Sequence, residues 1–399
     1  MFERSAKSVT LSPQMKNLLG IGTVSMSPDD LIRRILTSDV ELLWFGGIGT
    51  FIKATHESNA DAGDRANDNL RINGKDLHCQ VVGEGANLGM TQAGRIEYAR
   101  AGGRLNSDSV DNSAGVDCSD HEVNIKIQLA QVIASKKLAV KDRDKLLAVM
   151  TDEVSDLVLR DNYLQTGALS VAESEAAERL PNAQRLLRTL ERAGRINRVV
   201  DVLPDEEAMA QLVNAGQGLT RPELSALLAH AKLALNDELL ESDLPDEKLL
   251  EKDLIAYFPA EIRKKFAAAI PRHRLNREII VTILTNQIVN RAGFTFVNDL
   301  KERTGQGAPA IARGFAIVRD SFGLENIWAG IEALDNKVMA HKQTDMLLEI
   351  KRLMERAVMW FMQNGNHPLD IEKNIKNFRP GVAALTKALP TALSDNALM

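Results

Sequence analysis

The chain has 399 residues, which is more than one hydrophobic core usually supports, so its length predicts at least two domains. Hydrophobic residues make up 44% of it and charged residues 26%, which excludes a mostly disordered or collagen-like protein. No apolar run reaches the roughly 18 residues of a membrane span, and the net charge of −5 argues against a generally basic surface. We therefore expect a globular protein that binds neither a membrane nor a nucleic acid.

The first residues and the number of cysteines indicate the cellular compartment of the protein. The sequence begins MFERSAKS, without an apolar segment, so we expect no secretory signal. Two cysteines, Cys79 and Cys118, are too few for a disulfide framework. A reduced, cytoplasmic location is the simplest prediction.

Glycine is concentrated in the first third of the chain, where residues 1–125 hold 14 of the 26 glycines and only two of the 12 prolines, Pro13 and Pro28. This distribution predicts strands and tight turns first and helices afterwards. Within the first part, Ser27 precedes Pro28 and two aspartates. A serine cap, a proline in the first turn and acidic residues at the positive end of the dipole together predict the start of a helix.

Short apolar runs that stop at glycines predict strands in the same region. Residues 40–45 form the clearest run, residues 78–82 a second, and residues 104–107 a weaker third. Residues 90–101, between the last two, favour a helix. Strand, helix and strand at this spacing are typical of parallel α/β structure.

From about residue 122 onward, apolar residues recur at helical spacing and predict a long helical series. Thr220 and Glu223 form a capping box at the start of one helix. Residues 339–364 predict a single long helix followed by a glycine. The small and polar tail after Pro390 predicts an irregular end.

Two glycine-rich segments follow predicted strands and are candidates for ligand contact. Gly46 and Gly47 follow the first strand, where glycine lets a backbone approach a ligand, although a tight turn is favoured on the glycines alone. The dinucleotide-binding spacing G-x-G-x-x-G fails here because Ile52 occupies its last position. In the second segment, residues 83–89, Asn87 offers an amide for ligand binding or for capping the next helix.

Residues 106–122 form a dense polar run, which indicates either a functional loop or a solvated one. Cys118, Asp120, His121 and Glu122 could suggest a metal site. No second Cys or His pair stands at metal-binding spacing, so we predict none. The basic stretch 261–277 is interpreted as a solvated helix face that pairs with neighbouring acids, because the chain is acidic and poor in aromatic residues.

Several longer motifs resemble the large NAD-specific glutamate dehydrogenases of bacteria, and the resemblance covers nearly the whole chain, as a C-terminal portion of that longer family. The matching segments are residues 2–8, 43–50, 82–97, 111–124, 219–224 and 286–291. The resemblance implies the fold class α/β plus all-α. Residues 1–124 would be the C-terminal half of a Rossmann-like NAD-binding domain, and residues 125–399 a helical domain.

The resemblance also implies part of a site for NAD and glutamate. Gly46 and Gly47 match the strand end beside the cofactor ribose, and Asn87, in Gly85-Ala86-Asn87, matches a contact of the nicotinamide ribose. Asn112 matches the asparagine at the nicotinamide amide, and Ser119 matches the serine that holds the side-chain carboxylate of L-glutamate. Ser119 is expected just before a helix, where backbone N–H groups would assist it.

No catalytic residue carries over, because the family's lysines and aspartate lie in motifs that this sequence lacks. The reaction implied is oxidative deamination of L-glutamate to 2-oxoglutarate and ammonium with hydride transfer to NAD, and we expect the isolated chain to be inactive. The alternative is a helical assembly or regulatory module of the parent enzyme. The resemblance leaves the roles of Asp117, Asp120 and His121 open.

The resemblance also implies an oligomer and a covered sheet edge. We expect a homo-oligomer. A strand at 40–45 without its upstream neighbour would leave a hydrophobic edge. We expect that edge to be covered by residues 8–21 or by a second copy of the chain.

Overall fold

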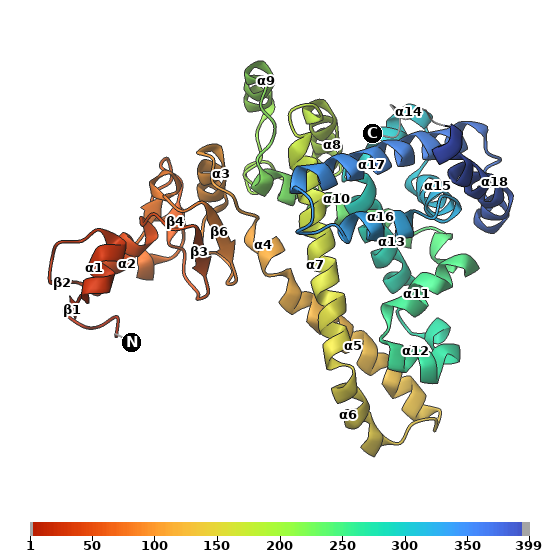
Figure 1. The fold of residues 1–399 in the computed structure, drawn as a ribbon, viewed down its shortest axis with the longest axis horizontal. Coiled ribbons are helices and arrows are strands. Elements are labelled where there is room, and N and C mark those ends of the chain that lie inside the picture. The colour runs from red at the N-terminus through yellow and green to blue at the C-terminus, as the bar shows by residue number, and fades with distance from the viewer. Residues whose placement is uncertain (1–2, 393–399) are drawn as a thin grey trace.

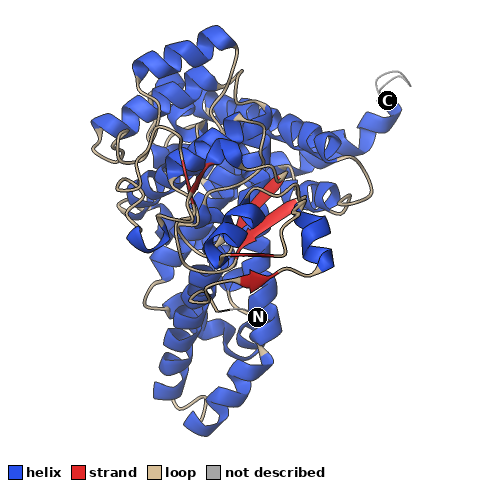
Figure 2. Ribbon diagram, turned by 90° about the vertical axis from the view of Figure 1, so that its left-hand side faces the viewer, coloured by secondary structure: helices blue, strands red, loops and turns tan. Residues whose placement is uncertain are grey.

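The computed structural model describes residues 3–392 of the chain. Small sheets occupy the N-terminal part, and helices form almost everything after it (Figures 1 and 2). This order confirms an α/β region followed by a helical region. None of the described helices is both long and apolar enough to cross a membrane.

The first part contains all the described strands, interspersed with short helices. They are β1 (Val9–Thr10), α1 (Pro13–Leu19), β2 (Ser25–Met26), α2 (Pro28–Leu36), β3 (Leu42–Phe45), β4 (Ile52–Lys53), β5 (Ile72–Asn73), β6 (Val81–Glu84), α3 (Gln92–Arg100) and α4 (Asp108–Asp111).

The remaining helices follow without a further strand. They are α5 (Ser113–Ala134), α6 (Val140–Val149), α7 (Thr151–Ser174), α8 (Leu180–Arg192), α9 (Glu206–Ala215), α10 (Arg221–Leu240), α11 (Glu251–Tyr257), α12 (Ala260–Phe266), α13 (Asn276–Ala292), α14 (Phe296–Thr304), α15 (Ala308–Ser321), α16 (Leu324–Glu332), α17 (Ala340–Asn364) and α18 (Ile371–Ala392).

The two best-defined predicted strands pair in parallel, in the register Leu42 opposite Val81 to Phe45 opposite Glu84. The second, predicted at 78–82, lies instead at Val81–Glu84 and continues through the glycine at which the prediction ended it. Helix α3 lies where the sequence predicts it. The third predicted strand, at 104–107, is wrong, because this segment makes only a parallel bridge between Val81 and Arg104. The short parallel pair β4–β5 was not predicted, since two-residue strands carry no readable periodicity.

Local helix signals act as the sequence predicts. The Ser27 hydroxyl accepts the Asp30 N–H at 3.1 Å at the start of α2. Both arms of the capping box between Thr220 and Glu223 are present at the start of α10. Helix α17 ends with Gly365 at its C-cap. The irregular tail expected after Pro390 falls mostly on residues 393–399, outside the described residues.

The long helix α5 begins at Ser113, about nine residues before the predicted start. The polar run hides this start, because its first helical turns lack the apolar spacing on which the prediction rests. Helix α5 also continues through residues 124 and 125, between which the sequence places a domain boundary. The boundary stays a prediction.

The outer edge of β3 has no strand beside it among the described residues, because its sheet contains only β3 and β6. The side chains of Leu42 and Trp44 are 57% and 59% exposed. Residues 8–21 instead form β1 and α1, which pack with α2 in a separate small core. The expectation that this segment covers the edge is therefore wrong, and cover by a second copy stays a prediction.

Polar contacts join the α/β region to the helical region between α3 and α10. Gln92 donates to the Pro222 carbonyl at 3.1 Å, and Arg100 donates to the Gly218 carbonyl at 2.9 Å. Arg100 also pairs with Glu223 at 3.1 Å. Glu223 therefore serves both the cap of α10 and the junction between the two regions.

The basic stretch 261–277 has acidic partners, as expected of a solvated face. Arg263 pairs with Glu153, and Lys265 pairs with Glu261. Arg277 pairs with Asp246. Two acids that precede this stretch in the sequence, Glu247 and Asp253, instead pair with arginines of α15.

Candidate functional site

The structure brings two of the predicted cofactor residues together. Asn87 follows β6, and Asn112 lies between α4 and α5. The Asn112 side-chain N–H donates to Asn87 Oδ1 at 2.7 Å. Both residues line a cleft of about 920 Å³ between the α/β region and helices α5, α7, α10 and α13. This volume is in the range of cofactor and substrate sites.

A buried ion network supports the loop that carries Asn87. Arg95 contacts Glu84 through two hydrogen bonds, of 2.6 and 2.9 Å, and pairs with Asp108 at 3.1 Å. Glu84 is 1% exposed and Arg95 4% exposed. Burial raises the pKa of Glu84, and the hydrogen bond and charge of Arg95 oppose that rise.

Two aspartates tie this loop to α4. Asp108 accepts the Leu88 N–H at 2.9 Å, and Asp111 accepts the Glu84 N–H at 3.0 Å. Leu88 adopts a left-handed backbone conformation, with φ of 63°, which such anchoring helps to hold. The short helix before Asn112 and the loop after β6 are therefore connected by both backbone and side-chain contacts.

The predicted glycines lie apart from the amide pair. Gly46 and Gly47 are exposed and do not line the cleft. Gly85 lies under the Trp44 ring, where an added Cβ would come within 2.4 Å of that ring. The Ala86 N–H donates to the Phe45 carbonyl at 3.0 Å and extends the β3–β6 pairing. The exposed Trp44 ring therefore fills the space beside Gly85, and the contact of Gly85 with the cofactor stays a prediction.

Ser119 is not at a helix start. It is exposed and lies within α5, where its hydroxyl donates to the Gly115 carbonyl at 3.1 Å. The predicted help from free backbone N–H groups is therefore wrong for Ser119, because α5 begins six residues earlier. Ser119 also does not line the cleft.

The cleft also holds ionisable side chains whose association the sequence did not reveal. Asp117 comes from α5, Asp161 from α7 and Lys232 from α10. Burial, with the negative charges of Asp161 and Asp120, raises the pKa of Asp117 to about 7. Burial lowers the pKa of Lys232 to about 8, and the negative charges of Asp161 and Asp117 oppose that change. No local motif surrounds Asp161 or Lys232, so no sequence signal pointed to them.

Family comparisons divide the chain into two matched parts. Residues 1–172 match the model described as bacterial NAD-glutamate dehydrogenase, catalytic domain. Residues 216–399 match the model described as glutamate dehydrogenase, C-terminal.

Curated relatives match over almost the whole chain. The NAD-specific glutamate dehydrogenase of Pseudomonas aeruginosa is 46% identical over 385 residues, and that of Halomonas elongata is 45% identical, each over 96% of this chain. The Mycobacterium tuberculosis protein of the same name is 40% identical over 99% of it. In each case the match covers 24% of the relative, so the chain spans about a quarter of the length of these proteins.

Proposed function

This chain belongs to the bacterial NAD-specific glutamate dehydrogenase family and matches its C-terminal portion, and on that premise we propose that its cleft receives the nicotinamide end of NAD. The parent protein would deaminate L-glutamate oxidatively to 2-oxoglutarate and ammonium. The observation that carries the proposal is the hydrogen bond between Asn112 and Asn87 at the cleft.

The unused hydrogen-bond donor and acceptor of this amide pair suit the carboxamide of a nicotinamide. Once Asn112 donates to Asn87 Oδ1, the Asn87 N–H group and the Asn112 oxygen have no hydrogen bond to any other described residue. One side chain therefore offers a donor and the other an acceptor. A carboxamide needs one of each, and the two asparagines would fix the plane of the ring by hydrogen bonds.

NAD would supply the hydride acceptor, while the protein orients the groups that react. In this proposal Asn112 and Asn87 position the nicotinamide and its ribose, and Gly46, Gly47, Gly85 and Ala86 form the strand ends along the cofactor. Ser119 would contact the side-chain carboxylate of glutamate through its hydroxyl alone. NAD is the cofactor, and no residue of this chain is assigned a catalytic role.

Membership of this family also supports a proposal for the domains and the oligomeric state of the protein. We propose that residues 1–124 form the second half of a Rossmann-like domain and that residues 125–399 form a helical domain. The proposed setting is a cytoplasmic homo-oligomer.

Replacing Asn112 by alanine in the full-length enzyme is expected to raise the KM for NAD about 5- to 30-fold, because a hydrogen bond of about 1–2 kcal/mol is lost. Asn87→Ala should act in the same direction. Steady-state kinetics with varied NAD measures both effects. Asn364→Ala is the matched control, since within residues 3–392 its side-chain amide donates only to the Trp360 carbonyl of its own helix. Unchanged KM and kcat in both site variants would contradict the assignment.

The 399-residue chain by itself is expected to form no NADH from NAD and glutamate, because the family's catalytic lysines and aspartate have no counterpart in it. An absorbance assay for NADH measures turnover, and calorimetric titration with NAD measures binding. The full-length enzyme serves as the positive control. Glutamate-dependent turnover by this chain would show that a complete site exists within it.

A further inference from the structure

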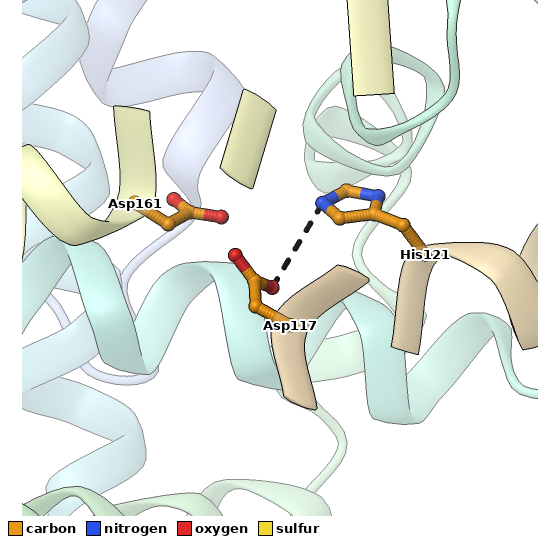
Figure 3. Close-up of side chains that lie close together, drawn as sticks. All are labelled: Asp117, His121 and Asp161. Carbon is orange, nitrogen blue, oxygen red and sulfur yellow. Dashed lines mark ion pairs between the residues drawn. The ribbon is translucent and has the colours of Figure 1, made fainter. Parts of the chain in front are cut away.

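Three side chains of metal-binding type converge beside the cleft, and two of them, Asp117 and Asp161, line it. Asp117 and His121 lie one turn apart on α5, and Asp161 faces them from α7 (Figure 3). One ligand atom from each lies within 4.8 Å of the other two. The closest approach of the imidazole is 4.0 Å, between His121 Nε2 and Asp117 Oδ1.

These side chains lack hydrogen-bonding partners among the described residues. The His121 side chain is 3% exposed, and its buried Nδ1 has no hydrogen bond. Its Nε2 points toward Asp117 at a distance too long for a hydrogen bond. One buried oxygen of Asp117 is also unpartnered. Buried polar atoms without partners are rare in native proteins, and an ion held between Nε2 and the two aspartates would give the Asp117 oxygen a partner. Nδ1 lies on the other side of the ring and would not contact that ion.

Neighbouring contacts hold the imidazole in this orientation. The His121 ring stacks on Tyr257, with 4.5 Å between ring centroids. Tyr257 is itself fixed, since its hydroxyl donates to Asp120 at 2.8 Å and accepts from Asn124 at 2.9 Å. The ring is therefore placed before any ligand arrives, as in sites whose surroundings orient the ligands.

The two carboxyl groups of the cluster have no direct cationic partner among the described residues. The Lys232 ammonium lies nearby but donates to Gln165 at 2.9 Å. The nearby Arg160 guanidinium pairs with Glu332 at 2.7 Å. A divalent cation would supply the positive charge that Asp117 and Asp161 lack in direct contact.

We propose that Asp117, His121 and Asp161 bind one divalent transition-metal ion of the zinc type. One imidazole nitrogen and two carboxylate oxygens suit Zn²⁺ or Mn²⁺, whereas an imidazole ligand disfavours Ca²⁺ and Mg²⁺. Ligands about 2.0–2.2 Å from one tetrahedral ion lie about 3.3–3.6 Å from each other, so the side chains need to close by up to about 1.5 Å. The cleft leaves a further position open to water.

No metal site was predicted from the sequence, because that prediction relied on ligands that lie close together in the chain. Asp161 lies 40 positions after His121 and meets it only through the packing of α7 on α5. The proposal does not depend on NAD binding, because it rests on ligand geometry and charge alone.

Calorimetric titration of the chelator-treated chain with Zn²⁺ tests the proposal, in a Cys118→Ser background that removes the exposed thiol beside Asp117. We expect one site per chain. His121→Gln, Asp117→Asn and Asp161→Asn should each weaken it at least about 10-fold, since even indirect contacts of metal sites have effects of 10- to 100-fold. Asp156→Asn is the matched control, because Asp156 is exposed on the same helix as Asp161.

A Co²⁺ absorption spectrum provides a second readout that does not depend on activity. Visible bands that appear in the parent chain and change in His121→Gln would support nitrogen ligation. Circular dichroism establishes that each variant is folded. Absence of stoichiometric binding by the folded parent chain would overturn the proposal, as would binding that all three ligand variants retain.

Discussion

Replacing Arg95 by methionine is expected to lower the free energy of unfolding by about 3–5 kcal/mol, because removal of one member of a buried ion pair leaves the other charge uncompensated. Arg95 is 4% exposed, and its partner Glu84 is 1% exposed. Methionine keeps much of the length of the side chain, so the loss comes mainly from the two acids, Glu84 and Asp108, that the guanidinium contacts. Urea denaturation followed by circular dichroism measures the change.

Two further variants separate the ion network from a general effect of removing charge. Arg33→Met changes an exposed arginine on α2 and should stay within about 0.5 kcal/mol of the parent. The double variant Glu84→Gln/Arg95→Met should recover part of the loss, because the uncompensated carboxylate is removed as well. A loss below about 1 kcal/mol in Arg95→Met would show that the network does not hold this region together.

The Arg95 network also bears on the proposed cofactor site. The Asp108 carboxylate pairs with Arg95 and also accepts a hydrogen bond from the N–H of Leu88, the residue next to Asn87. Loss of the guanidinium should therefore loosen the loop that places Asn87 against Asn112. In the full-length enzyme, Arg95→Met should weaken NAD binding as well as stability, although Arg95 does not line the cleft.

Replacing Trp328 by alanine is expected to destabilise the helical region by about 3–5 kcal/mol, as in other truncations of buried aromatic residues. Trp328 is 1% exposed on α16. The Arg291 guanidinium lies 4.6 Å from the centre of its ring and pairs with Glu332 at 2.7 Å. The substitution thus leaves a cavity and removes a cation–π contact at the same place.

Trp360→Ala is the matched control for this prediction. Trp360 is 47% exposed, although its ring contacts Phe361 and Phe378. Because the free energy of burial follows the area removed from water, its loss should be less than half that of Trp328. Denaturation monitored by far-ultraviolet circular dichroism compares the two variants, and equal losses would contradict the assignment of Trp328 to the core.

Helix ends were the most predictable part of the fold. Ser27 before Pro28, and Thr220 with Glu223, place the starts of α2 and α10, because capping is a contact between residues only three positions apart. The start of α5 was missed, because residues 113–122 begin a helix whose first turns are polar. The strand predicted at 104–107 is absent for a related reason. The length of a strand depends on how far it pairs with its neighbour, and here pairing is limited to the bridge between Arg104 and Val81.

For the site, the sequence by itself determined the family and the candidate amides Asn87 and Asn112, because both lie within long contiguous motifs. Only the tertiary structure decided that these amides meet across 25 positions and that Asp161 and Lys232 approach Asp117 from two other helices. It also decided that Ser119 lies within α5 and that Gly85 packs under Trp44. The physical reason is the range of the contacts: local patterns specify helices and turns, whereas the packing of whole elements determines which distant side chains share a cleft.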